Sequence, residues 1–394
     1  MNSKKYLVLG TGVGEAIAYM LAKSIDTHLI VVGDIDIERA IKVCNFVNKF
    51  SRSRCICTTT LFDVEKTQDH VAVFKKFDVV ISALPAKYNL GLAEAAILAD
   101  TNFCDLGGVV EITRKMLQLG NKYHNIKSSI VPDCGLMPGL GLIILLKLFL
   151  ECSAQMLRPN SATIYVGGIP QKPKPPLFYQ PMFCIEGLMH LCFDKAPIVR
   201  NGEIILADPF SEYEQIHVPE LIPYSKQFNG TVEAFITAGT SIAPWYLQKC
   251  DIENFCEKTI RWPGFVEFVK PLTQDNFGEK MKATISAPID ENNPDLVWMK
   301  VELSGKDSNS TPWSRNVTLL DLLDPETGLT AMQRTTGFTT AIIAEMMTEG
   351  KTKPGVNTPE NALDHSGLNE VIDRVSDLWY RLSSCHHLGG IAER

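Results

Sequence analysis

Three closely spaced glycines, Gly10, Gly12 and Gly14, stand between a short apolar run and a stretch with helical apolar spacing. Glycines let the backbone approach a phosphate, which the free N–H groups and positive dipole of a helix start stabilise. The spacing is G-x-G-x-G, one residue short of the usual G-x-G-x-x-G. Asp34 ends the next apolar run, and Arg39 lies inside the following helix. An aspartate there binds a ribose diol and repels a 2′-phosphate, so the pattern predicts an NAD site, with NADP less suited. The alternative is a tight turn in a fold that binds something else.

Two reactive side chains, Asp105 and Cys134, follow later apolar runs. Because a nicotinamide would extend past the carboxyl ends of neighbouring strands, both fall where the reacting ring is expected. We interpret Asp105 as a group that moves a proton, the alternative being an Asx turn or helix N-cap. Cys134 faces the same crevice, or else is a small apolar filler. A third segment at this edge is predicted to contact the cofactor through Ser82, Ala83, Leu84 and Pro85.

These residues require a sheet that brings strand ends together. Short, nearly all-apolar runs alternate with helical patterns over the first third of the chain, which predicts a parallel sheet covered on both faces. The predicted strands are residues 6–9, 29–32, 78–82, 102–108 and 129–132, and the predicted helices include 16–21, 37–50 and 93–98. The fold class is therefore α/β, with a doubly wound Rossmann sheet.

From about residue 162 the pattern changes to strand-like runs separated by turn residues, which predicts a mainly antiparallel second domain. The runs are 163–166, 198–199, 203–205, 231–237, 282–286 and 297–303. Prolines crowd residues 167–181, so we expect an extended surface segment there. Residues 336–349 are apolar at helical spacing, with Gly350 as the stop, and we expect this helix to return to the first domain.

Composition narrows the class of protein. The 394 residues suggest two or three domains. The net charge of −7 without a Lys/Arg cluster argues against nucleic acid and polybasic membrane binding, and favours a small-molecule partner. No apolar stretch reaches the roughly 20 residues of a membrane span, and no signal peptide is evident, so we expect a cytoplasmic protein. The 11 cysteines are odd in number, as for reduced thiols. Cys55 with Cys57, and His386 with His387, lack the second half of a metal site, so no metal is expected.

Several motifs together resemble the saccharopine dehydrogenase family of NAD(P)-dependent oxidoreductases. They are VISALP at 80–85, DLGG at 105–108 and PDCGLMPG at 132–139. Further segments are most similar to its lysine 6-dehydrogenase branch, namely GGIPQ at 167–171, PPL at 175–177, IEGL at 185–188, VEAF at 232–235 and KTIRWPG at 258–264. The resemblance runs from about residue 5 to about residue 360. One departure is AGT at 238–240, where saccharopine-forming members tend to carry an Arg-Asp pair.

The resemblance implies a Rossmann domain over 1–135, an inserted α+β domain over 136–325 that binds substrate and mediates dimerisation, and C-terminal helices over 326–394 that return to the Rossmann domain. Within the second domain, Arg261 is the candidate for a substrate carboxylate, because a guanidinium binds it through two parallel hydrogen bonds. The alternative for Arg261 is an ion pair. Glu186 and Glu233 are candidates for a substrate ammonium, or else solvated positions.

The predicted function is an NAD-dependent dehydrogenase that oxidises a C–N bond of an amino acid, with hydrolysis of the imine releasing ammonia or another amine. The expected partners are the amino acid and a second copy of the chain in a homodimer. Two alternatives remain. One is saccharopine or carboxynorspermidine-type chemistry, and the other is a nucleotide-binding sensor without catalysis, for which the short glycine turn is the reason.

Overall fold

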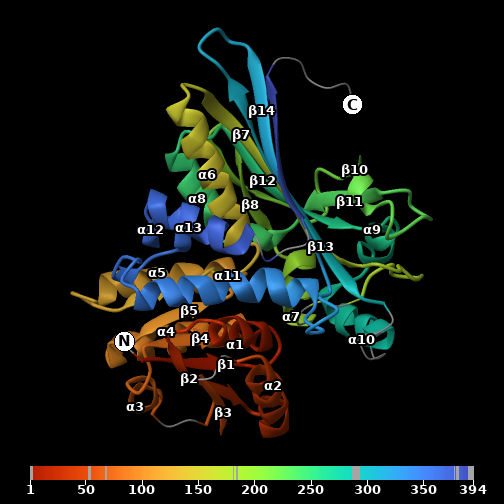
Figure 1. Ribbon diagram of the computed structural model, residues 1–394. Helices are drawn as coiled ribbons and strands as arrows, with labels where there is room; N and C mark the ends of the chain where they lie inside the picture. The colour runs from red at the N-terminus through yellow and green to blue at the C-terminus, as the bar shows by residue number, and fades with distance from the viewer. Residues whose placement is uncertain are drawn as a thin grey trace. The chain divides into compact units, whose positions relative to one another are not determined.

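The computed structural model describes residues 3–51, 55–66, 69–180, 182, 185–285, 293–376, 378 and 381–388. The chain divides into two compact units (Figure 1). The first unit comprises Met1–Ile143 and Gln333–Leu378, and the second comprises Ile144–Met332 and Trp379–Arg394. Each unit is built around its own sheet.

The first unit holds a seven-stranded parallel sheet in the order β15-β6-β5-β4-β1-β2-β3. Its strands are β1 (Lys4–Leu9), β2 (Thr27–Asp34), β3 (Ile56–Leu61), β4 (Val79–Ser82), β5 (Asn102–Asp105), β6 (Ser129–Val131) and β15 (Gly355–Val356). The chain moves outward from β1 through β2 to β3, and then returns to the other side of β1 for β4, β5 and β6. This is the predicted doubly wound α/β sheet, and ligands of such sheets bind at the carboxyl ends where the strand order reverses, between β1 and β4.

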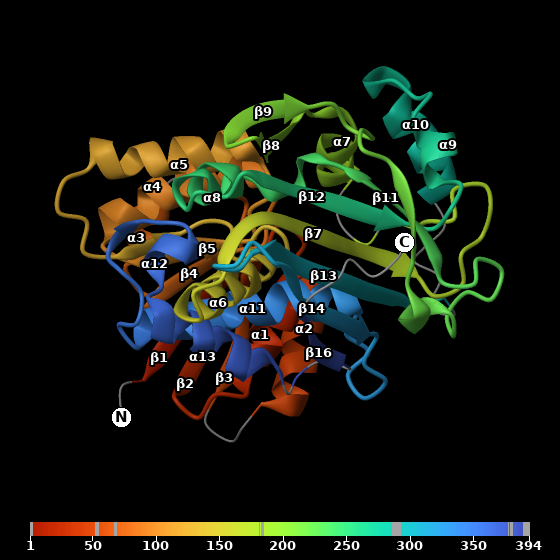
Figure 2. The same cartoon turned by 90° about the horizontal axis from the view of Figure 1, so that it is seen from above.

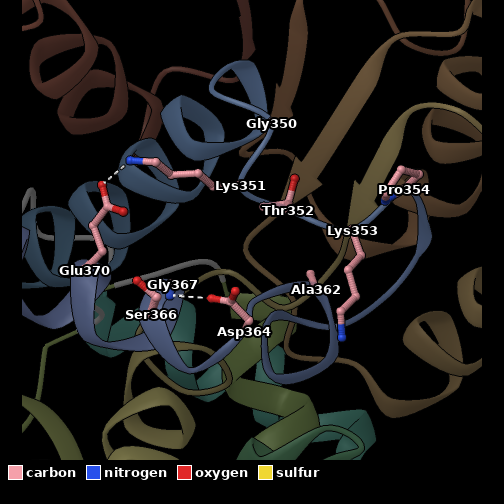
Figure 3. A pocket seen from close by; sticks show the side chains of 10 residues that line it. All are labelled: Gly350, Lys351, Thr352, Lys353, Pro354, Ala362, Asp364, Ser366, Gly367 and Glu370. Carbon is pink, nitrogen blue, oxygen red and sulfur yellow. Dashed lines mark hydrogen bonds and ion pairs between the residues drawn. The ribbon is translucent and has the colours of Figure 1, made fainter.

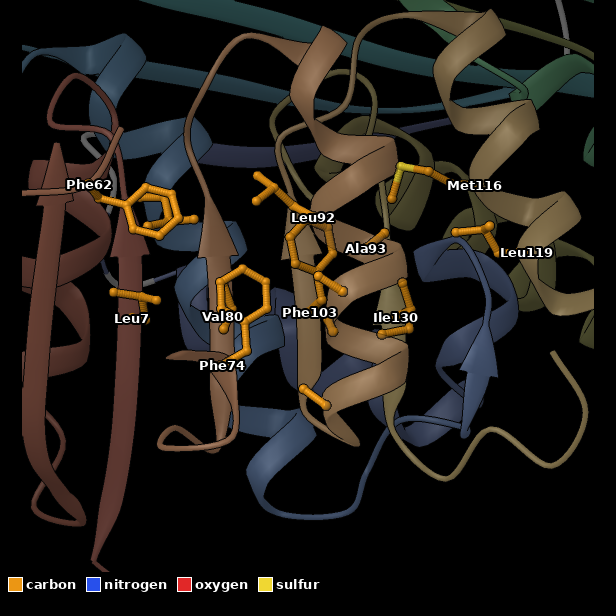
Figure 4. Packing of buried hydrophobic residues seen from close by; sticks show 14 residues of the cluster. Leu7, Phe62, Phe74, Val80, Leu92, Ala93, Phe103, Met116, Leu119 and Ile130 are labelled. Carbon is orange, nitrogen blue, oxygen red and sulfur yellow. The ribbon is translucent and has the colours of Figure 1, made fainter. Parts of the chain in front are cut away.

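The helices of this unit are α1 (Gly14–Ala22), α2 (Ile37–Phe50), α3 (His70–Phe74), η1 (Ala86–Tyr88), α4 (Asn89–Ala99), α5 (Val110–Lys122), α12 (Pro359–Ala362), α13 (His365–Ser376) and most of α11 (Ala331–Thr348). Figure 4 shows Leu7, Val80, Phe103 and Ile130, one from each of four strands, in one apolar cluster with Leu92 of α4. All five side chains are buried, and such burial stabilises by about 1.5–3 kcal/mol each.

The second unit holds a larger mixed sheet in the order β10-β11-β12-β7-β13-β14-β16, with β8 and β9 paired beside β12. Its strands are β7 (Arg158–Pro170), β8 (Ala196–Arg200), β9 (Glu203–Ala207), β10 (Glu214–His217), β11 (Thr231–Ile236), β12 (Asn254–Arg261), β13 (Asp295–Lys306), β14 (Pro312–Leu322) and β16 (Arg381–Leu388). β7 and β12 are parallel, and the other pairs are antiparallel. Figure 2 shows β12, β7, β13 and β14 side by side.

The helices that accompany this sheet are α6 (Leu140–Ala154), α7 (Ile185–Phe193), η2 (Pro219–Leu221), η3 (Ala238–Thr240), α8 (Ala243–Lys249), α9 (Phe265–Val269) and α10 (Gln274–Ile285). The prediction of a strand at 282–286 is wrong, because residues up to Ile285 belong to α10. Phe277 and Met281, one helical turn apart, are both buried in one apolar cluster, which fixes the helical period. Ser286 lies outside the described residues.

The proline-dense segment also differs from its prediction. Residues 167–170 complete β7, a central strand between β12 and β13, rather than running over the surface. Pro170 is the last residue of the strand, where its missing N–H is least costly. Its carbonyl accepts a hydrogen bond from the indole of buried Trp262 at 2.8 Å. Leu177 and Tyr179 are buried too, so this segment is part of the core. Pro181 lies outside the described residues.

The C-terminal portion is not purely helical. Helix α11 supplies the predicted apolar helix, and Gly350 follows it with φ +70°. After it, β15 joins the first sheet beside β6, whereas β16 pairs with β14 in the second sheet. The prediction that 326–394 are helices returning to the first domain is therefore wrong for β16. The alternating polar sequence of 381–388 carries little apolar signal, which explains why it was missed.

Candidate functional site

The glycine turn between β1 and α1 leaves room for a phosphate. Gly10 has φ +93°, and a Cβ there would lie 2.7 Å from the Ala83 carbonyl oxygen, so only glycine fits. A Cβ on Gly14 would lie 3.1 Å from Val8 Cγ1, which is the close helix–strand packing that the third glycine of the usual motif provides. At Gly12, no described atom comes within 4 Å of the Cβ position. The shortened turn thus keeps an open helix start.

Asp34 is fixed beside this turn. Its Oδ2 accepts a hydrogen bond from Thr11 Oγ1 at 2.8 Å, and its Oδ1 accepts one from the Asp36 N–H at 2.9 Å. Asp36 in turn caps α2 by accepting from the N–H groups of Glu38 and Arg39. Arg39 lies in the first turn of α2, as expected, and its Nε lies 3.3 Å from Asp36 Oδ2.

The segment 82–85 continues the same edge of the sheet. Ser82 pairs in register with Asp105 on β5, and its buried hydroxyl donates to Asn89 Oδ1 at 2.7 Å. The Ala83 N–H donates to the Leu9 carbonyl at 2.7 Å, which ties the segment to the end of β1. Leu84 and Pro85 then lead into η1 and are partly or fully accessible. The four predicted cofactor contacts therefore lie at the point where the strand order reverses.

Asp105 is a buried carboxyl with one oxygen unused. Its side chain is 1% exposed. Oδ1 accepts from the Gly107 N–H at 2.7 Å and from the Asp133 N–H at 3.2 Å, whereas Oδ2 has no hydrogen-bond partner. Burial, and then the charge of Asp133, raises the pKa of Asp105 to about 7. A carboxyl with such a pKa can both accept and donate a proton near neutral pH.

Two further carboxyl groups were not singled out from the sequence, namely Asp133, which adjoins Asp105, and Glu360, which interacts electrostatically with Asp133. Asp133 has φ +67°, and its Oδ1 accepts from the Thr113 hydroxyl at 3.0 Å. Glu360 comes from α12, which follows β15 and lies next to the end of β6. Burial raises the pKa of Glu360 to about 7, and Asp133 raises it further. Asp133 stands inside the PDCGLMPG motif, but Glu360 is far away in sequence, so no local signal identifies it.

The Cys134 side chain is buried and is not exposed at the carboxyl-terminal edge of the parallel sheet. The side chain is fully buried, and its thiol donates to the Val131 carbonyl at 3.2 Å. Its N–H donates to the Asp105 carbonyl at 2.8 Å, and its carbonyl accepts from the Thr340 hydroxyl at 2.9 Å. Burial raises the pKa of the thiol well above its ordinary value. The structure therefore brings Cys134 next to Asp105 as a protonated, packed thiol.

In the second unit, Arg261 at the end of β12 is buried, with 3% of its surface exposed. One terminal nitrogen donates to the Ile260 carbonyl at 2.7 Å, and the guanidinium carbon lies 4.6 Å from the Tyr179 ring centre and 5.4 Å from that of Phe265. The Nε–H has no hydrogen-bond acceptor. A guanidinium with an unused N–H donor can donate a hydrogen bond to an anionic oxygen.

The two glutamates predicted for a substrate ammonium lie elsewhere. The carboxylate of Glu233 accepts from the Gly264 N–H at 3.0 Å and the Val266 N–H at 3.1 Å, so both oxygens cap the start of α9. Glu186 lies in the first turn of α7 and is exposed. The structure gives Glu233 a structural role and leaves Glu186 on the surface.

Sequence reasoning missed Glu257, which is 1% exposed on β12. Its two carboxylate oxygens accept from the hydroxyls of Thr259 and Thr237, each at 3.2 Å. Burial raises the pKa of Glu257 to about 8, although its threonine partners and Arg261 act in the opposite direction. The signal that could have identified it is the alternation 257, 259, 261, which places three polar side chains on one face of a strand.

A separate hollow of about 480 Å³ lies in the first unit, among residues 350–354 and 362–370 (Figure 3). Because residues 350–354 precede β15, this hollow is at the amino end of a parallel strand, opposite to the edge where such sheets bind ligands. Lys351 and Glu370, which line it, pair with each other at 2.7 Å. No residue predicted for the site lines this hollow.

The described part of the chain contains neither a metal-binding cluster nor a helix that could span a membrane. No cluster of three or more His, Cys, Asp or Glu side chains is arranged to hold a metal ion there, and the side chains of His386 and His387 fall outside what is described. Among the helices described, none has both the length and the apolar character needed to cross a bilayer.

Comparison with known proteins assigns both parts of the chain to one family. A family model described as the saccharopine dehydrogenase NADP binding domain matches residues 6–130, and one described as the saccharopine dehydrogenase C-terminal domain matches residues 135–377. A curated relative is the saccharopine dehydrogenase (NADP(+), L-glutamate-forming) of Pyricularia oryzae. It is 22% identical over 283 residues, which are 70% of this chain and 58% of the relative.

The chain thus spans less than two thirds of that relative. The solved apo saccharopine dehydrogenase (L-Glu forming) of Saccharomyces cerevisiae superposes with a TM-score of 0.76 at 16% identity, over 97% of this chain and all of that one. At this identity the likeness shows the fold. The match at 135–377 alone covers more than half of the sequence. The chain therefore belongs to the saccharopine dehydrogenase family.

Proposed function

We propose that this protein is a pyridine-nucleotide-dependent oxidoreductase that oxidises a C–N bond of an amino acid, as lysine 6-dehydrogenases do. The observation that carries the proposal is the Asp105 carboxyl. It is buried at the carboxyl end of β5, has an unused oxygen, and has a pKa near 7. A group of this kind is suited to exchange a proton with a substrate nitrogen.

Asp105 has a defined task in this reaction. The carboxylate accepts a proton from the substrate ammonium, which leaves a neutral amine. The nicotinamide, when bound, takes up a hydride from the carbon next to that nitrogen, and an iminium remains. Water then adds to the iminium carbon and releases a carbonyl compound and ammonia, or a second amino compound if the nitrogen carries two carbon groups. Cys134, a protonated and buried thiol, packs beneath Asp105 and positions it.

We propose NAD as the preferred cofactor, although the matching family model is described as an NADP binding domain. Asp34 is held next to the glycine turn by Thr11, and Asp36, two residues later, donates its backbone N–H to Asp34. A 2′-phosphate would meet two carboxylates there, against the single guanidinium of Arg39, which is already paired with Asp36. The charges at the end of β2 therefore favour an unmodified ribose.

Two other functions remain to be separated by experiment. Saccharopine is the second candidate substrate, because the curated relative is named for it. Against it stands the segment 238–240, which contains no charged residue. A sensor without catalysis is the third candidate, and the short glycine turn is the reason for considering it. Against it, Gly14 provides the close helix–strand packing of the usual third glycine.

A spectrophotometric screen tests the proposal. The full chain is mixed with NAD or NADP and, in turn, with lysine, ornithine, saccharopine and simple diamines, and nicotinamide reduction is followed. We expect turnover with a lysine-like amino acid and NAD, and its loss in Asp105→Asn. A matched control is Glu111→Gln, an exposed carboxylate at the start of α5. Nucleotide binding without turnover on any compound would instead identify a sensor.

A homodimer and a cytoplasmic location belong to the same proposal. The homodimer rests on the family resemblance, and the cytoplasmic location rests on cysteines placed as reduced thiols are. Light scattering of the purified chain tests the first, since a mass near 43.7 kDa would indicate a monomer. Fractionation of cells that express the full gene tests the second.

A further inference from the structure

The shortened glycine turn is contacted by a side chain 321 positions later in the sequence. Gln333, near the start of α11, donates hydrogen bonds from Nε2 to the Gly12 carbonyl at 3.0 Å and to Glu15 Oε2 at 3.2 Å. Figures 1 and 2 show α11 alongside α1, and both belong to the first unit from Gln333 onward. The helices pack closely at Gly337, where a Cβ would lie 2.9 Å from Ala16 Cβ. The turn is therefore held from the side of α11.

The same turn is also held from the side of the sheet. The Gly10 N–H donates to the Gly33 carbonyl at 2.8 Å, and the Thr11 hydroxyl donates to Asp34. These two hydrogen bonds fix the first half of the turn against β2. The second half, which leads into α1, receives its side-chain hydrogen bonds from Gln333.

The start of α1 keeps N–H groups for a ligand. Val13 precedes the helix, and no side chain caps its first turn. The Glu15 N–H donates to the Thr11 carbonyl at 3.3 Å, whereas the three N–H groups before it have no acceptor among the described residues. Because the C=O and N–H of a trans peptide unit point in opposite directions, the hydrogen bond between Gln333 and the Gly12 carbonyl directs the Val13 N–H away from α11. Free N–H groups at a helix start favour a phosphate.

Glu15 carries a charge that opposes a phosphate at this position. It lies in the first turn of α1, beside the same N–H groups. A carboxylate there interacts favourably with the positive end of the helix dipole and so competes with an anionic ligand. Burial raises the pKa of Glu15, whereas the hydrogen bond from Gln333 lowers it. That hydrogen bond keeps the carboxylate on the side of the turn that faces α11.

We propose that Gln333 is a positioning residue for the cofactor, which holds the Gly12 carbonyl and the Glu15 carboxylate away from the pyrophosphate. The inference rests on the proposed function, in which the glycine turn binds a pyridine nucleotide. Gln333 acts through the turn and not on the reacting atoms. The proposal also explains how a turn that lacks one residue can keep its N–H groups available, since α11 fixes the turn from outside.

Ligand binding by the full chain tests the proposal, with two probes that differ in the pyrophosphate. NADH contains this group and is followed by its fluorescence, whereas adenosine lacks it and is measured by competition with NADH. We expect Gln333→Leu to weaken NADH by about 5- to 20-fold and to leave adenosine unchanged. Adding Glu15→Gln should recover about 2- to 5-fold of this loss, because it removes the charge. The matched control is Gln118→Leu, an exposed glutamine on α5 that should change neither probe.

Four results would overturn the proposal. They are no NADH binding by the wild-type chain, unchanged NADH binding in Gln333→Leu, an equal loss of NADH and adenosine in that variant, and no recovery with Glu15→Gln. If Gln333→Leu does not fold, Gln333→Met replaces it, since methionine has a similar length and no donor. Turnover is measured separately. NADH binding that depends on Gln333, without turnover on any amino acid, would refute the proposed function and leave the role of Gln333 standing.

Discussion

Replacing Asp105 by asparagine should lower activity and raise stability at alkaline pH. The amide oxygen can still accept from the N–H groups of Gly107 and Asp133, so the local fold is preserved. The proton-accepting oxygen is lost, however, and removing a general base typically lowers the rate by about 10²- to 10⁴-fold. We expect kcat/KM to fall within this range, while nucleotide affinity stays the same.

The stability change follows from the pKa of the same carboxyl. Its pKa is about 7 in the folded chain, against an ordinary value of 3.8. Between these values the folded state holds a proton that the unfolded state has lost, so the contribution of Asp105 is retained at low pH and lost as the pH rises through about 7. The difference corresponds to at most about 4 kcal/mol at pH 8. Asparagine does not ionise, so Asp105→Asn should be the more stable protein there.

Two measurements check this reasoning. Thermal melting from pH 5 to pH 9 should show wild-type Tm falling relative to the variant, by about 2–4 °C per kcal/mol. The pH profile of wild-type kcat/KM should lose activity below about pH 7, because a protonated Asp105 cannot accept a proton. Asp133→Asn should move this acid limb to lower pH, since it removes the charge that raises the pKa of Asp105. Near wild-type turnover in Asp105→Asn, or an acid limb that Asp133→Asn does not move, would refute the role.

Four other outcomes are expected. Asp34→Ala should weaken NAD by about 1–3 kcal/mol and reduce the preference over NADP, and equal kcat/KM for the two cofactors in the wild type would count against it. Cys134→Ser should reduce turnover far less than Asp105→Asn, as steady-state kinetics would show. Gly10→Ala should lower the unfolding free energy by about 1–3 kcal/mol because φ is +93°, whereas Gly12→Ala should melt normally and bind nucleotide weakly. Arg261→Ala should lower kcat/KM by roughly 30- to 5,000-fold with NAD affinity unchanged, and loss of NAD affinity would mark it as structural.

The parallel sheet was predictable because its strands are short apolar runs that end in turn residues. Helix α2 occurs at the predicted residues, and Gly10 and Asp34 lie together because consecutive parallel strands end at one edge. Strand β3 was not predicted, because threonines interrupt its apolar pattern. Such a pattern is typical of an edge strand with one exposed face. In the parallel sheet, apolar periodicity thus finds the central strands and misses the two edge strands, β3 and β15.

The candidate site was only partly predictable, since its members come from distant parts of the chain. Asp105 could be identified from its strand-end position, but its unused oxygen is visible only in the structure. Glu360 follows β15, whose pairing with β6 joins residues far apart in sequence. Glu233 was chosen by residue type, which does not reveal that two backbone N–H groups of α9 already occupy its carboxylate. The residue type shows which reactions or contacts a side chain can make. Only its hydrogen-bond partners in the structure show whether that side chain is still able to bind a ligand.

In each of the two units, a glycine makes room for a buried carboxyl group. A Cβ on Gly107 would lie 2.1 Å from Asp133 Oδ1, and a Cβ on Gly239 would lie 2.7 Å from Glu257 Oε2. In each case a buried carboxyl occupies the volume that any other side chain would need. Gly107 and Gly239 are therefore required by the acids packed against them, and Gly107 also by its φ of +71°. When a carboxyl group occupies the space that the Cβ of a glycine would need, the glycine indicates a buried acid beside it. This holds even where the acid is distant in sequence.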